Sequence, residues 1–435
     1  MYIIKQRISL LAALFAVFAI PAFSQINTYS PYTRFGLGDI SRDGFTQNFS
    51  MGGTGIAIQD KNSLNYMNPA AYAARDSMSV LLDFGMNVAY NQYLTSTQQK
   101  DWWNGSFHHI ALSLPVGKYL AIGTGLVPFS SVGYNIKQEY NELGTGDAID
   151  FYYTGDGGVM KYFLGMSGTL FNRISIGSNM NVLIGDITRQ RIMTFPRNRG
   201  FAETQAVDEI SLQHVYFGFG IQYKEVFSDK FFFTLGATYD MQTDLNSAFN
   251  TSVRNIFKGN IGTINDSVPL SNAYELISEE SNKAIVLPAK IGVGVAMGIP
   301  GKLTLTGDYI TQNWAEVNNT FDVDGFDLAL SRSISGGIEY IPDFEAFRGY
   351  HNLISYRLGG YAHDSYVKVG EEQIKNYGIT FGVGLPMGRA GSSLNIGFDL
   401  GTRGTTENNL IKENYGILTF SVTLHDLWFY KRKYD

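Results

Sequence analysis

The feature that most constrains this chain is a two-residue alternation whose small face is unusually rich in glycine. Between residues 285 and 299 every odd position is apolar, whereas the even positions are mostly Gly or Ala with a single lysine. From Leu394 to Leu400 the bulky apolar residues again alternate with Asn, Gly and Asp. A soluble sheet turns its bulky residues toward a packed core. Bulky residues outside and small or charged residues inside are typical of a transmembrane β-barrel.

Composition excludes several other classes of protein. The 435 residues include 48 Gly and 14% aromatic residues, but only 17% charged residues, against roughly 25% in an average soluble domain. The formal charge of -6 argues against nucleic acid as a partner, and the absence of cysteine excludes thiolate metal sites, cysteine nucleophiles and disulfides. The mean hydropathy of -0.07 leaves no room for several apolar helices of about 20 residues.

The one long apolar run lies at the N-terminus. Lys5 and Arg7 precede the apolar residues 10–20, and Ala22-Phe23-Ser24 supplies small residues before Gln25. This order predicts a secretory signal peptide over residues 1–24.

The same alternation extends along residues 78–427 and predicts an all-β fold, an antiparallel transmembrane barrel of about 14 strands. Each strand exceeds the roughly 9 to 11 residues that a tilted crossing needs. The expected strands are 78–93, 105–116, 119–135, 157–171, 173–189, 210–225, 230–245, 284–299, 302–315, 329–342, 352–368, 374–386, 393–405 and 411–427.

The connections between these strands alternate in length, which is typical of barrels with short periplasmic turns and longer outer loops. The short connections are 116–118, 172–173, 228–229, 300–301 and 387–392, and the long ones are 136–156, 190–209, 246–283 and 316–328. Strand 1 is therefore expected to run outward and strand 14 inward.

Residues 25–77 do not read as barrel strands. They contain their own apolar residues, a glycine-rich stretch with Gly52, Gly53 and Gly55, and an Asn68-Pro69-Ala70 element. We expect this segment to fold into the lumen as an N-terminal hatch that plugs the barrel. Residues 428–435 form an aromatic and basic tail, which we expect on the periplasmic side.

These motifs resemble the FadL/TodX long-chain fatty-acid transporter family of outer-membrane proteins. Met51 to Ala57 followed by Asn68-Pro69-Ala70 is similar to the hatch of that family, and the stretches from Ser30 to Asp39 and from Trp428 to Lys433 resemble its Bacteroidota branch. The resemblance implies a hatch inside a fourteen-stranded barrel in the outer membrane of a Gram-negative bacterium. It also implies a hydrophobic ligand that enters from outside and leaves sideways through a defect in the wall.

The expected wall defect lies in the strand 119–135. Pro128 lacks a backbone N–H and is followed by Ser130, Ser131 and Gly133, so this strand cannot complete its ladder there. We expect these four residues to form the lateral opening. The alternative is a bulge without function at the outer rim.

Several charged residues have the inward phase of the alternation. The candidates for a ligand site are Lys290, Arg403, Asp399 and Arg357, and Asp83, Asp308 and Glu339 share their phase. Pairing with one another or with the hatch is the favoured role, since buried charges need partners. Binding of an anionic head group by Lys290 and Arg403 is the alternative. His108 and His109 are adjacent and are expected on opposite faces of their strand.

No catalytic motif is present, and neither a cofactor nor a metal site is expected, so the chain is not predicted to be an enzyme. The favoured function is uptake of hydrophobic compounds, with outer-membrane lipid and a hydrophobic small molecule as partners. The alternative is a non-transporting accessory barrel or shuttle subunit, bound to protein partners of a secretion or outer-membrane assembly machine. The 246–283 connection and the 428–435 tail would then be contact surfaces.

Overall fold

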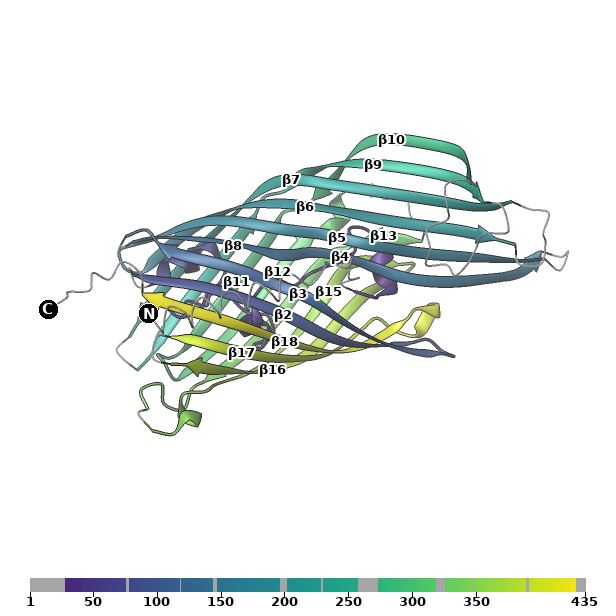
Figure 1. Cartoon of the computed structure of the whole chain (residues 1–435). Helices are drawn as coiled ribbons and strands as arrows, with labels where there is room; N and C mark the ends of the chain where they lie inside the picture. The colour runs from purple at the N-terminus through teal and green to yellow at the C-terminus, as the bar shows by residue number, and fades with distance from the viewer. Residues whose placement is uncertain are drawn as a thin grey trace, which may run out of the picture.

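The computed structural model describes residues 28–75, 78–117, 119–143, 147–195, 202–227, 230–256, 273–317, 325–346, 348–388 and 391–427. They form a closed antiparallel barrel of fourteen wall strands, as predicted, with almost no helix (Figure 1). The ring closes where β18 (Lys412–Leu427) pairs with β2 (Ser79–Leu94) along its whole length. Closure leaves no sheet edge to be satisfied by lipid at this seam.

Eleven wall strands consist of one element each, and three are interrupted. Besides β2 and β18, the uninterrupted strands are β3 (Gln99–Pro115), β4 (Leu120–Leu143), β5 (Asp147–Leu170), β6 (Ile174–Thr194), β7 (Glu203–Val226), β12 (Leu303–Asn313), β15 (Ser355–Val369), β16 (Glu372–Met387) and β17 (Ser392–Arg403). The interrupted strands are β8 (Phe232–Asp240) with β9 (Thr243–Ile256), β10 (Ala273–Leu287) with β11 (Lys290–Ile299), and β13 (Phe326–Leu328) with β14 (Leu330–Tyr340).

The remaining elements are short. In the N-terminal segment, defined here as residues 28–75, they are η1 (Pro31–Arg34), β1 (Asp39–Ile40), α2 (Thr46–Phe49) and η2 (Pro69–Ala74). Between wall strands they are η4 (Trp314–Glu316), η5 (Tyr350–Asn352) and η6 (Glu407–Asn409). The described ranges contain no helix with the length and hydropathy of a bilayer span.

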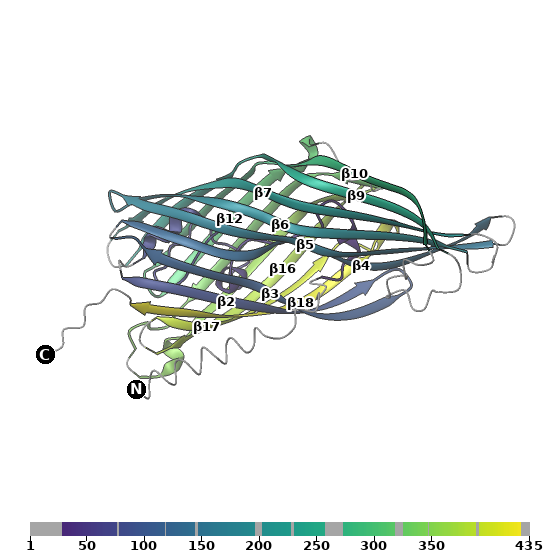
Figure 2. The ribbon, with the colours of Figure 1, turned by 45° about the horizontal axis from the view of Figure 1, so that its top comes forward.

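The barrel has two unlike ends. The proximal end, at the left of Figure 1, carries the first residue of β2, the last residue of β18 and the short turns such as 300–302. At the distal end β4 to β7 and β9 to β10 rise as a tall wall beyond their neighbours (Figures 1 and 2). The strands β4, β5 and β7 have 24 residues each, whereas β12 has 11.

The tall wall corrects the predicted outer loops. The predicted loop 136–156 is mostly strand, because β4 runs to Leu143 and β5 starts at Asp147. The predicted loop 246–283 likewise supplies most of β9 and β10, which pair with each other from Thr243 to Ile256. Both stretches are predicted as long connections between strands. A sheet surrounded by water has polar side chains on its outward face, so polar composition alone does not distinguish a strand of this kind from a loop.

The proximal half of the wall has the polarity of a membrane barrel. Outward residues there are bulky and exposed, among them Val215, Phe219, Ile221, Ile291 and Val293. Inward residues are polar and buried, among them Asn179, Gln222, Thr234, Thr306 and Thr423. An outward apolar band of this kind suits lipid.

The distal half of the tall wall has the opposite polarity. Its inward residues are apolar and buried, and they include Ile187, Leu212, Leu245, Phe249 and Ile285. Its outward residues are polar and exposed, and they include Asp186, Ser211, Asn246 and Asn282. A strand of 24 residues tilted by about 40° rises roughly 60 Å, whereas the apolar band of such barrels is about 25 Å tall. The tall wall therefore continues well beyond the band.

Leu287 shows where the phase changes. The alternation predicts that it faces lipid together with Ile291, but it is buried and packs in the interior cluster, so this expectation is wrong. The interruption at Pro288 and Ala289 shifts which positions face outward between β10 and β11. Leu287 therefore faces inward, whereas Ile291, four residues later, faces outward. Phe398 is half-exposed on the outward face, as expected.

The N-terminal segment lies inside the ring of strands, where its purple ribbon is visible in Figures 1 and 2. Its short elements contact β4, β5, β6, β7, β16 and β17. The predicted signal peptide 1–24 and the predicted tail 428–435 lie outside the described residues.

Candidate functional site

The wall ladder is interrupted between β3 and β4. The two strands pair from Pro115 and Ala121 up to Ile110 and Leu126, and no further pair joins them. Beyond this point β4 continues to pair with β5 as far as Leu143, while β3 continues with β2. The β2–β3 hairpin and the tall wall thus separate at the level of Pro128.

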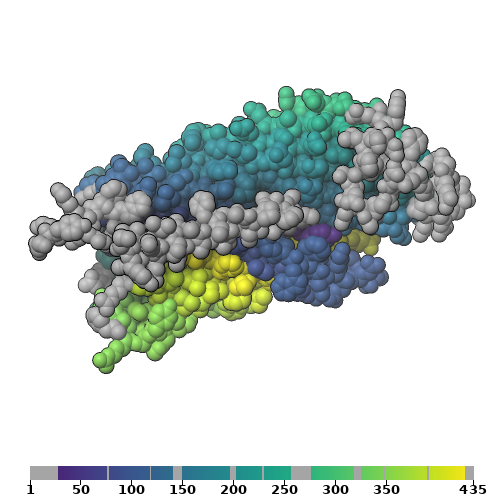
Figure 3. All heavy atoms as spheres, viewed as in Figure 1, coloured from purple at the N-terminus to yellow at the C-terminus, as the bar shows by residue number. Residues whose placement is uncertain are grey.

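The N-terminal segment covers the edge of β4 at this interruption. Ile40 and Asp39 of β1 pair with Ser130 and Ser131 of β4. Further along the edge, the Ser41 N–H donates to the Phe129 carbonyl at 2.9 Å and the Ser30 N–H donates to the Gly133 carbonyl at 2.8 Å. Figure 3 shows a purple patch of this segment between the β2–β3 hairpin and the wall above it.

The four residues predicted to form a lateral opening therefore all lie at the end of the β3–β4 ladder. The ladder between β4 and β5 also has a bulge between Pro128 and Ser130. The missing N–H of Pro128 and this bulge account for the local irregularity. At Ser130, Ser131 and Gly133 the edge is bonded to the chain's own N-terminal segment.

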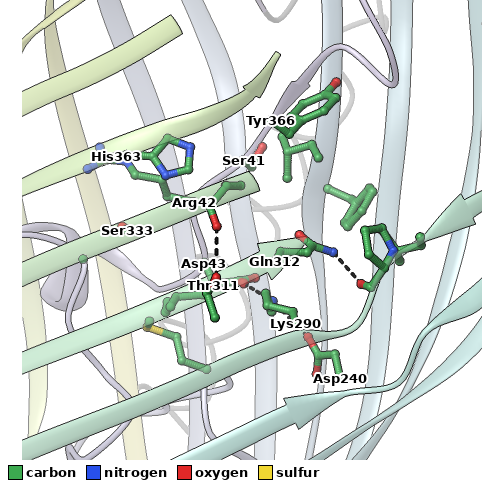
Figure 4. Close-up of a pocket in the computed structure, with 18 of the residues that line it drawn as sticks. Ser41, Arg42, Asp43, Asp240, Lys290, Thr311, Gln312, Ser333, His363 and Tyr366 are labelled. Atoms are coloured by element: carbon green, nitrogen blue, oxygen red, sulfur yellow. Dashed lines mark hydrogen bonds and ion pairs between the residues drawn. The ribbon is translucent and has the colours of Figure 1, made fainter. Parts of the chain in front are cut away.

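Asp43 forms the centre of an ion-pair network in the lumen. Its carboxylate accepts from the Nζ atoms of Lys161 in β5 and Lys290 in β11, each at 2.7 Å. Lys290 also lies 2.9 Å from Asp240, and Figure 4 shows it between the two carboxylates. Tyr66 donates its hydroxyl to Asp43 at 3.1 Å. One aspartate thus joins the N-terminal segment to two strands on different parts of the wall.

The electrostatics of Asp43 follow from this arrangement. Burial alone would raise the pKa of its carboxyl, but the ammonium groups of Lys161 and Lys290 hold that pKa well below its ordinary value. The pKa of the neighbouring Tyr66 hydroxyl is raised well above its ordinary value by burial and by the charge of Asp43. Asp43 is therefore charged and Tyr66 neutral at neutral pH.

A second set of charges fixes the adjoining part of the segment. Arg42 pairs with Asp399 of β17, and its guanidinium lies 3.9 Å from the centre of the Tyr361 ring. Tyr361 donates its hydroxyl to Asp399 at 2.8 Å. Burial would lower the pKa of Arg42, but the charge of Asp399 outweighs it and the pKa lies above its ordinary value.

The predicted lumen charges all face inward and all have partners. Lys290 and Asp399 pair with the N-terminal segment as described above, and Arg403 pairs with Asp39 at 2.9 Å. Arg357 pairs with Glu339 at 2.6 Å and donates to Asn395 at 2.9 Å. The geometry thus places each of these groups in an ion pair within the barrel.

The glycine-rich stretch lies where the segment touches the wall. Gly52 and Gly53 have φ of +73° and +85°, in the left-handed region that favours glycine. The Gly52 N–H donates to the Thr380 hydroxyl at 2.8 Å, and a Cβ at Gly52 would lie 2.5 Å from the Gly360 carbonyl oxygen. Gly55 donates its N–H to Asp308 at 2.6 Å.

Glycines of the wall strands also lie where the N-terminal segment comes close to the wall. A Cβ at Gly236 would lie 2.2 Å from the Ile56 carbonyl oxygen, and one at Gly359 would lie 2.2 Å from the Gly52 nitrogen. Gly220 and Gly382 are equally close to Asn68 and Ser50. The small inward face read from the sequence is thus the surface on which the N-terminal segment rests.

The Asn68-Pro69-Ala70 element anchors the segment at the proximal side. Asn68 caps η2 by accepting from the Ala70 N–H at 3.0 Å. Its amide group donates to the carbonyls of Ile56 at 2.8 Å and Ile221 at 3.2 Å. Pro69 packs against Gly177, where a Cβ would lie 2.6 Å from the Pro69 carbonyl oxygen.

A pocket lies between the ion-pair network and the interrupted ladder (Figure 4). Its lining includes the charged residues Arg42, Asp43, Lys161, Lys290 and Asp240. Its lining also includes apolar and aromatic residues, namely Ile40, Phe129, Leu287, Ile310, Trp314 and Tyr366. An amphipathic lining of this kind can hold an apolar molecule.

His108 and His109 do not take opposite faces, so that expectation is wrong. The β2–β3 ladder shifts register between Gly85 and Met86, and the extra residue on β3 is His108. Both imidazoles are buried, their Nδ1 atoms are 2.6 Å apart, and His109 Nε2 lies 2.8 Å from Asp83. No group of three metal-ligating side chains occurs in the described ranges.

The sequence did not point to Asp43, Arg42 or Lys161. Arg42 and Asp43 are adjacent charges in a segment otherwise rich in apolar and small residues, and this is a usable signal. Lys161 lies in the strand Asp147–Leu170 among Gly, Tyr and Phe, at an inward position. Which charge meets which depends on the position of the segment in the barrel, and no short-range pattern records it.

Comparisons with known proteins give one family and one fold. A family model described as BamG matches residues 3–435. No curated protein matches the chain. The family matched over the whole chain is thus BamG and not the FadL/TodX family that the motifs resemble.

Solved structures of FadL/TodX proteins share the fold. The Ralstonia pickettii toluene transporter TbuX is 12% identical, with a TM-score of 0.58 over 88% of this chain and 98% of that one. The P. putida toluene transporter TodX is 14% identical, with a TM-score of 0.58 over 90% and 100%. A Pseudomonas aeruginosa FadL homologue is 11% identical, with a TM-score of 0.57 over 90% and 100%.

Proposed function

The chain belongs to the BamG family, and from this premise we propose that it is a non-catalytic accessory barrel of an outer-membrane assembly machine in a Gram-negative bacterium. In this role the barrel binds protein partners instead of passing a small molecule. The observation that carries the proposal is the occupied lumen, in which the N-terminal segment is held by ion pairs of Asp43, Arg42 and Asp39 with the wall.

The location in the outer membrane rests on the exposed apolar band of the proximal half. Such a band requires lipid, and closure of the ladder between β18 and β2 lets the wall cross it without an open edge there. Residues 1–24 would direct export. Residues 28–75 would act as a hatch, fixed in the lumen by the contacts described above.

The lumen charges favour a structural role for the barrel over capture of an anionic ligand. Lys290, the best candidate for a carboxylate site, has Asp43 and Asp240 within 3 Å. A ligand carboxylate would have to displace one of them from Lys290, although Asp43 and Asp240 are only 20% and 23% exposed and gain from this ion pair. At Arg403 a ligand carboxylate would compete with Asp39, which already lies 2.9 Å away.

Two surfaces are available to a protein partner in this proposal. The outer part of β3 has no pair on the side of β4, and its Trp103 is 68% exposed, unlike most tryptophans in folded proteins. The pair β9–β10 forms one side of the tall wall and exposes Leu276 and Ile277. Exposed aromatic residues and free strand edges are frequent in interfaces.

Purification in a mild non-ionic detergent tests the proposal. We expect the barrel to elute with protein partners in fixed stoichiometry, and we expect a variant with charges on the outer β3, Trp103→Glu, to lose at least one of them. A matched variant on another part of the wall, Tyr356→Glu in β15, should keep all partners, since Tyr356 is also an exposed aromatic residue. A barrel that elutes alone with an apolar ligand would refute this function.

Uptake of hydrophobic compounds is the second candidate, and the amphipathic pocket beside the interrupted ladder favours it. The substrate would pass from this pocket to the lipid through the wall at Pro128 to Gly133. Gly133→Trp is then expected to abolish uptake while the barrel still assembles. Gly307→Trp is the control, because a Cβ there meets only the Ser335 carbonyl oxygen at 3.7 Å. Unchanged uptake in Gly133→Trp would refute this route.

A further inference from the structure

A second cavity lies on the inner face of the tall wall, at the distal end. It is bordered by Arg34 of the N-terminal segment, by Arg189 and Arg191 of β6, and by the aromatic rings of Tyr134, Phe151 and Tyr153. The cavity lies above the apolar band, because the outward positions of β6 at this level, such as Asp186, are polar and exposed. It is separate from the pocket around Lys290.

The charge of this cavity is opposite to that of the chain. Its lining has three arginines and one carboxylate, Asp208, whereas the whole chain has a formal charge of -6. Asp208 lies 3.3 Å from Arg191. Asp208 is the one carboxylate among the lining residues, so Arg34 and Arg191 together carry more positive charge than it neutralises.

Arg34 is the residue that points to a ligand. Its guanidinium carbon lies 4.0 Å from the centre of the Tyr153 ring, and within the described residues it forms neither a hydrogen bond nor an ion pair. The ring covers one face of the guanidinium and fixes its plane. Its N–H groups lie in that plane, in the fork that carboxylates and phosphates bind in a bidentate manner.

The two other arginines have different roles in the cavity. Arg189 is buried and donates to the Gly36 carbonyl oxygen, which ties β6 to the N-terminal segment just beyond Arg34. Arg191 is half-exposed and remains accessible beside Asp208. The aromatic rings next to them stand in one row, since Phe151 and Tyr153 are stacked with centroids 6.3 Å apart.

We propose that this distal cavity, bordered by Arg34, Arg191 and the Phe151–Tyr153 rings, binds small organic anions that carry a carboxylate or phosphate group on an aromatic or aliphatic body. The anionic group meets Arg34 and Arg191, and the apolar body packs on the rings. The site does not depend on the accessory role of the barrel, because it uses only residues of this chain.

Calorimetric titration of the detergent-solubilised full chain tests the site with soluble probes. We expect 3-phenylpropionate and phenyl phosphate to bind at least tenfold more tightly than 3-phenylpropanol, which has the same ring but no charge. Inorganic phosphate should bind more weakly than phenyl phosphate, since it has no apolar body. Whichever of the two aryl anions binds more tightly identifies the head group. Equal binding of the alcohol and the anions would overturn the proposal.

Arginine variants locate the binding. Arg34→Met should weaken binding of the preferred anion about tenfold or more, Arg34→Lys should weaken it less, and Arg191→Gln should weaken it severalfold. The matched control is Arg332→Gln, because Arg332 is 50% exposed beside Asp364 at 3.4 Å, much as Arg191 is 48% exposed beside Asp208 at 3.3 Å. Equal affinities in Arg34→Met and Arg332→Gln would refute the site.

Two further measurements keep the result clear. Thermal unfolding of each variant by circular dichroism shows that the barrel is intact, and Arg191→Gln, at an exposed position, serves if Arg34→Met does not fold. Raising the salt concentration from 50 to 500 mM should weaken anion binding, since the interaction is between charges near water. Failure to find protein partners would leave these binding results unchanged, and so the two proposals can fail separately.

Discussion

The proximal and distal halves of the wall are built from the same strands but with opposite polarity. In β6, Ile176 and Met180 face outward below and are exposed, whereas Asp186 faces outward above. On the inner face the order is reversed, from Asn179 and Asn181 below to Leu183 and Ile187 above. In the proximal half of the strand the apolar side chains thus face outward to lipid. In its distal half they face inward and pack in the interior.

The difference shows that the period of the alternation and the side on which the apolar residues lie are determined separately. The two-residue period indicates a strand. Whether the bulky apolar residues face outward or inward depends on whether lipid or water surrounds the wall. Below, lipid accepts bulky side chains, so the lumen is left to polar groups that must pair. Above, water surrounds the wall, so the apolar side chains turn inward and form the cluster around Leu37, Leu245 and Trp314.

The largest expected effect comes from breaking the polar interior at its centre. Asp43→Asn leaves Lys161, which is 7% exposed, without its carboxylate partner, and such a loss costs about 3 to 5 kcal/mol. We expect the N-terminal segment to open more often. The chain has no cysteine, so Ser50→Cys, at a buried position, can report opening through its rate of labelling by a water-soluble maleimide.

The control for this experiment is Asp364→Asn. Asp364 pairs with the half-exposed Arg332, and a pair of this kind contributes about 0 to 1 kcal/mol. Labelling at position 50 should remain at the wild-type rate in this background. Equal labelling in the Asp43→Asn and wild-type backgrounds would show that the network does not hold the segment.

A charge on the outward face tests the polarity of the two halves directly. Val293→Arg places a guanidinium in the apolar band, and we expect it to destabilise the barrel by about 2 to 4 kcal/mol. Ala248→Arg places the same group on the outward face of β9, where it is exposed, and it should change stability by less than about 0.5 kcal/mol. Urea titration after refolding into lipid vesicles measures both. Equal losses of stability in the two variants would mean that the lipid-facing band does not end between Val293 and Ala248.

Much of the wall could be predicted from the sequence. The alternation of Ile291 and Val293 against Gly292 and Gly294 reports a local preference, so the strands and the lipid-facing side of the proximal half follow from it. The distal extension 246–256 could not be separated from a loop, because it carries the polar residues of a surface in water. The phase shift at Leu287 depends on an interruption of two residues that tertiary pairing decides.

The site was accessible to sequence analysis only in part. The inward phase of Lys290, Asp399, Arg403 and Arg357 follows from position in a strand, but their partners do not. Asp43 meets Lys290 across 247 positions, and a single sequence carries no record of such a contact. The bulge that brings His108 beside His109 is likewise a property of the pairing with Gly85 and not of the strand itself.

The smallest expected effect is that of pH on the opening of the N-terminal segment. It tests whether the ion pairs of the polar interior stay charged near neutral pH. The pKa of Asp43 is lower in the folded barrel than its ordinary value of about 4. A carboxyl of this kind contributes stability that is fully present above the ordinary pKa and is lost as the pH falls from there toward the folded value. Because maleimide reacts with the thiolate, the labelling rate at position 50 is divided at each pH by the rate for the denatured chain at the same pH. Between pH 8 and pH 5 we expect no change in this ratio. Below about pH 4 this ratio should rise in the wild-type background, and it should rise less in the Asp43→Asn background, which has no carboxyl at position 43 to protonate. A rise of the ratio that begins above pH 5 in the wild type but not in Asp43→Asn would contradict the lowered pKa of Asp43, because Lys161 and Lys290 would then not be holding its carboxyl in the charged form.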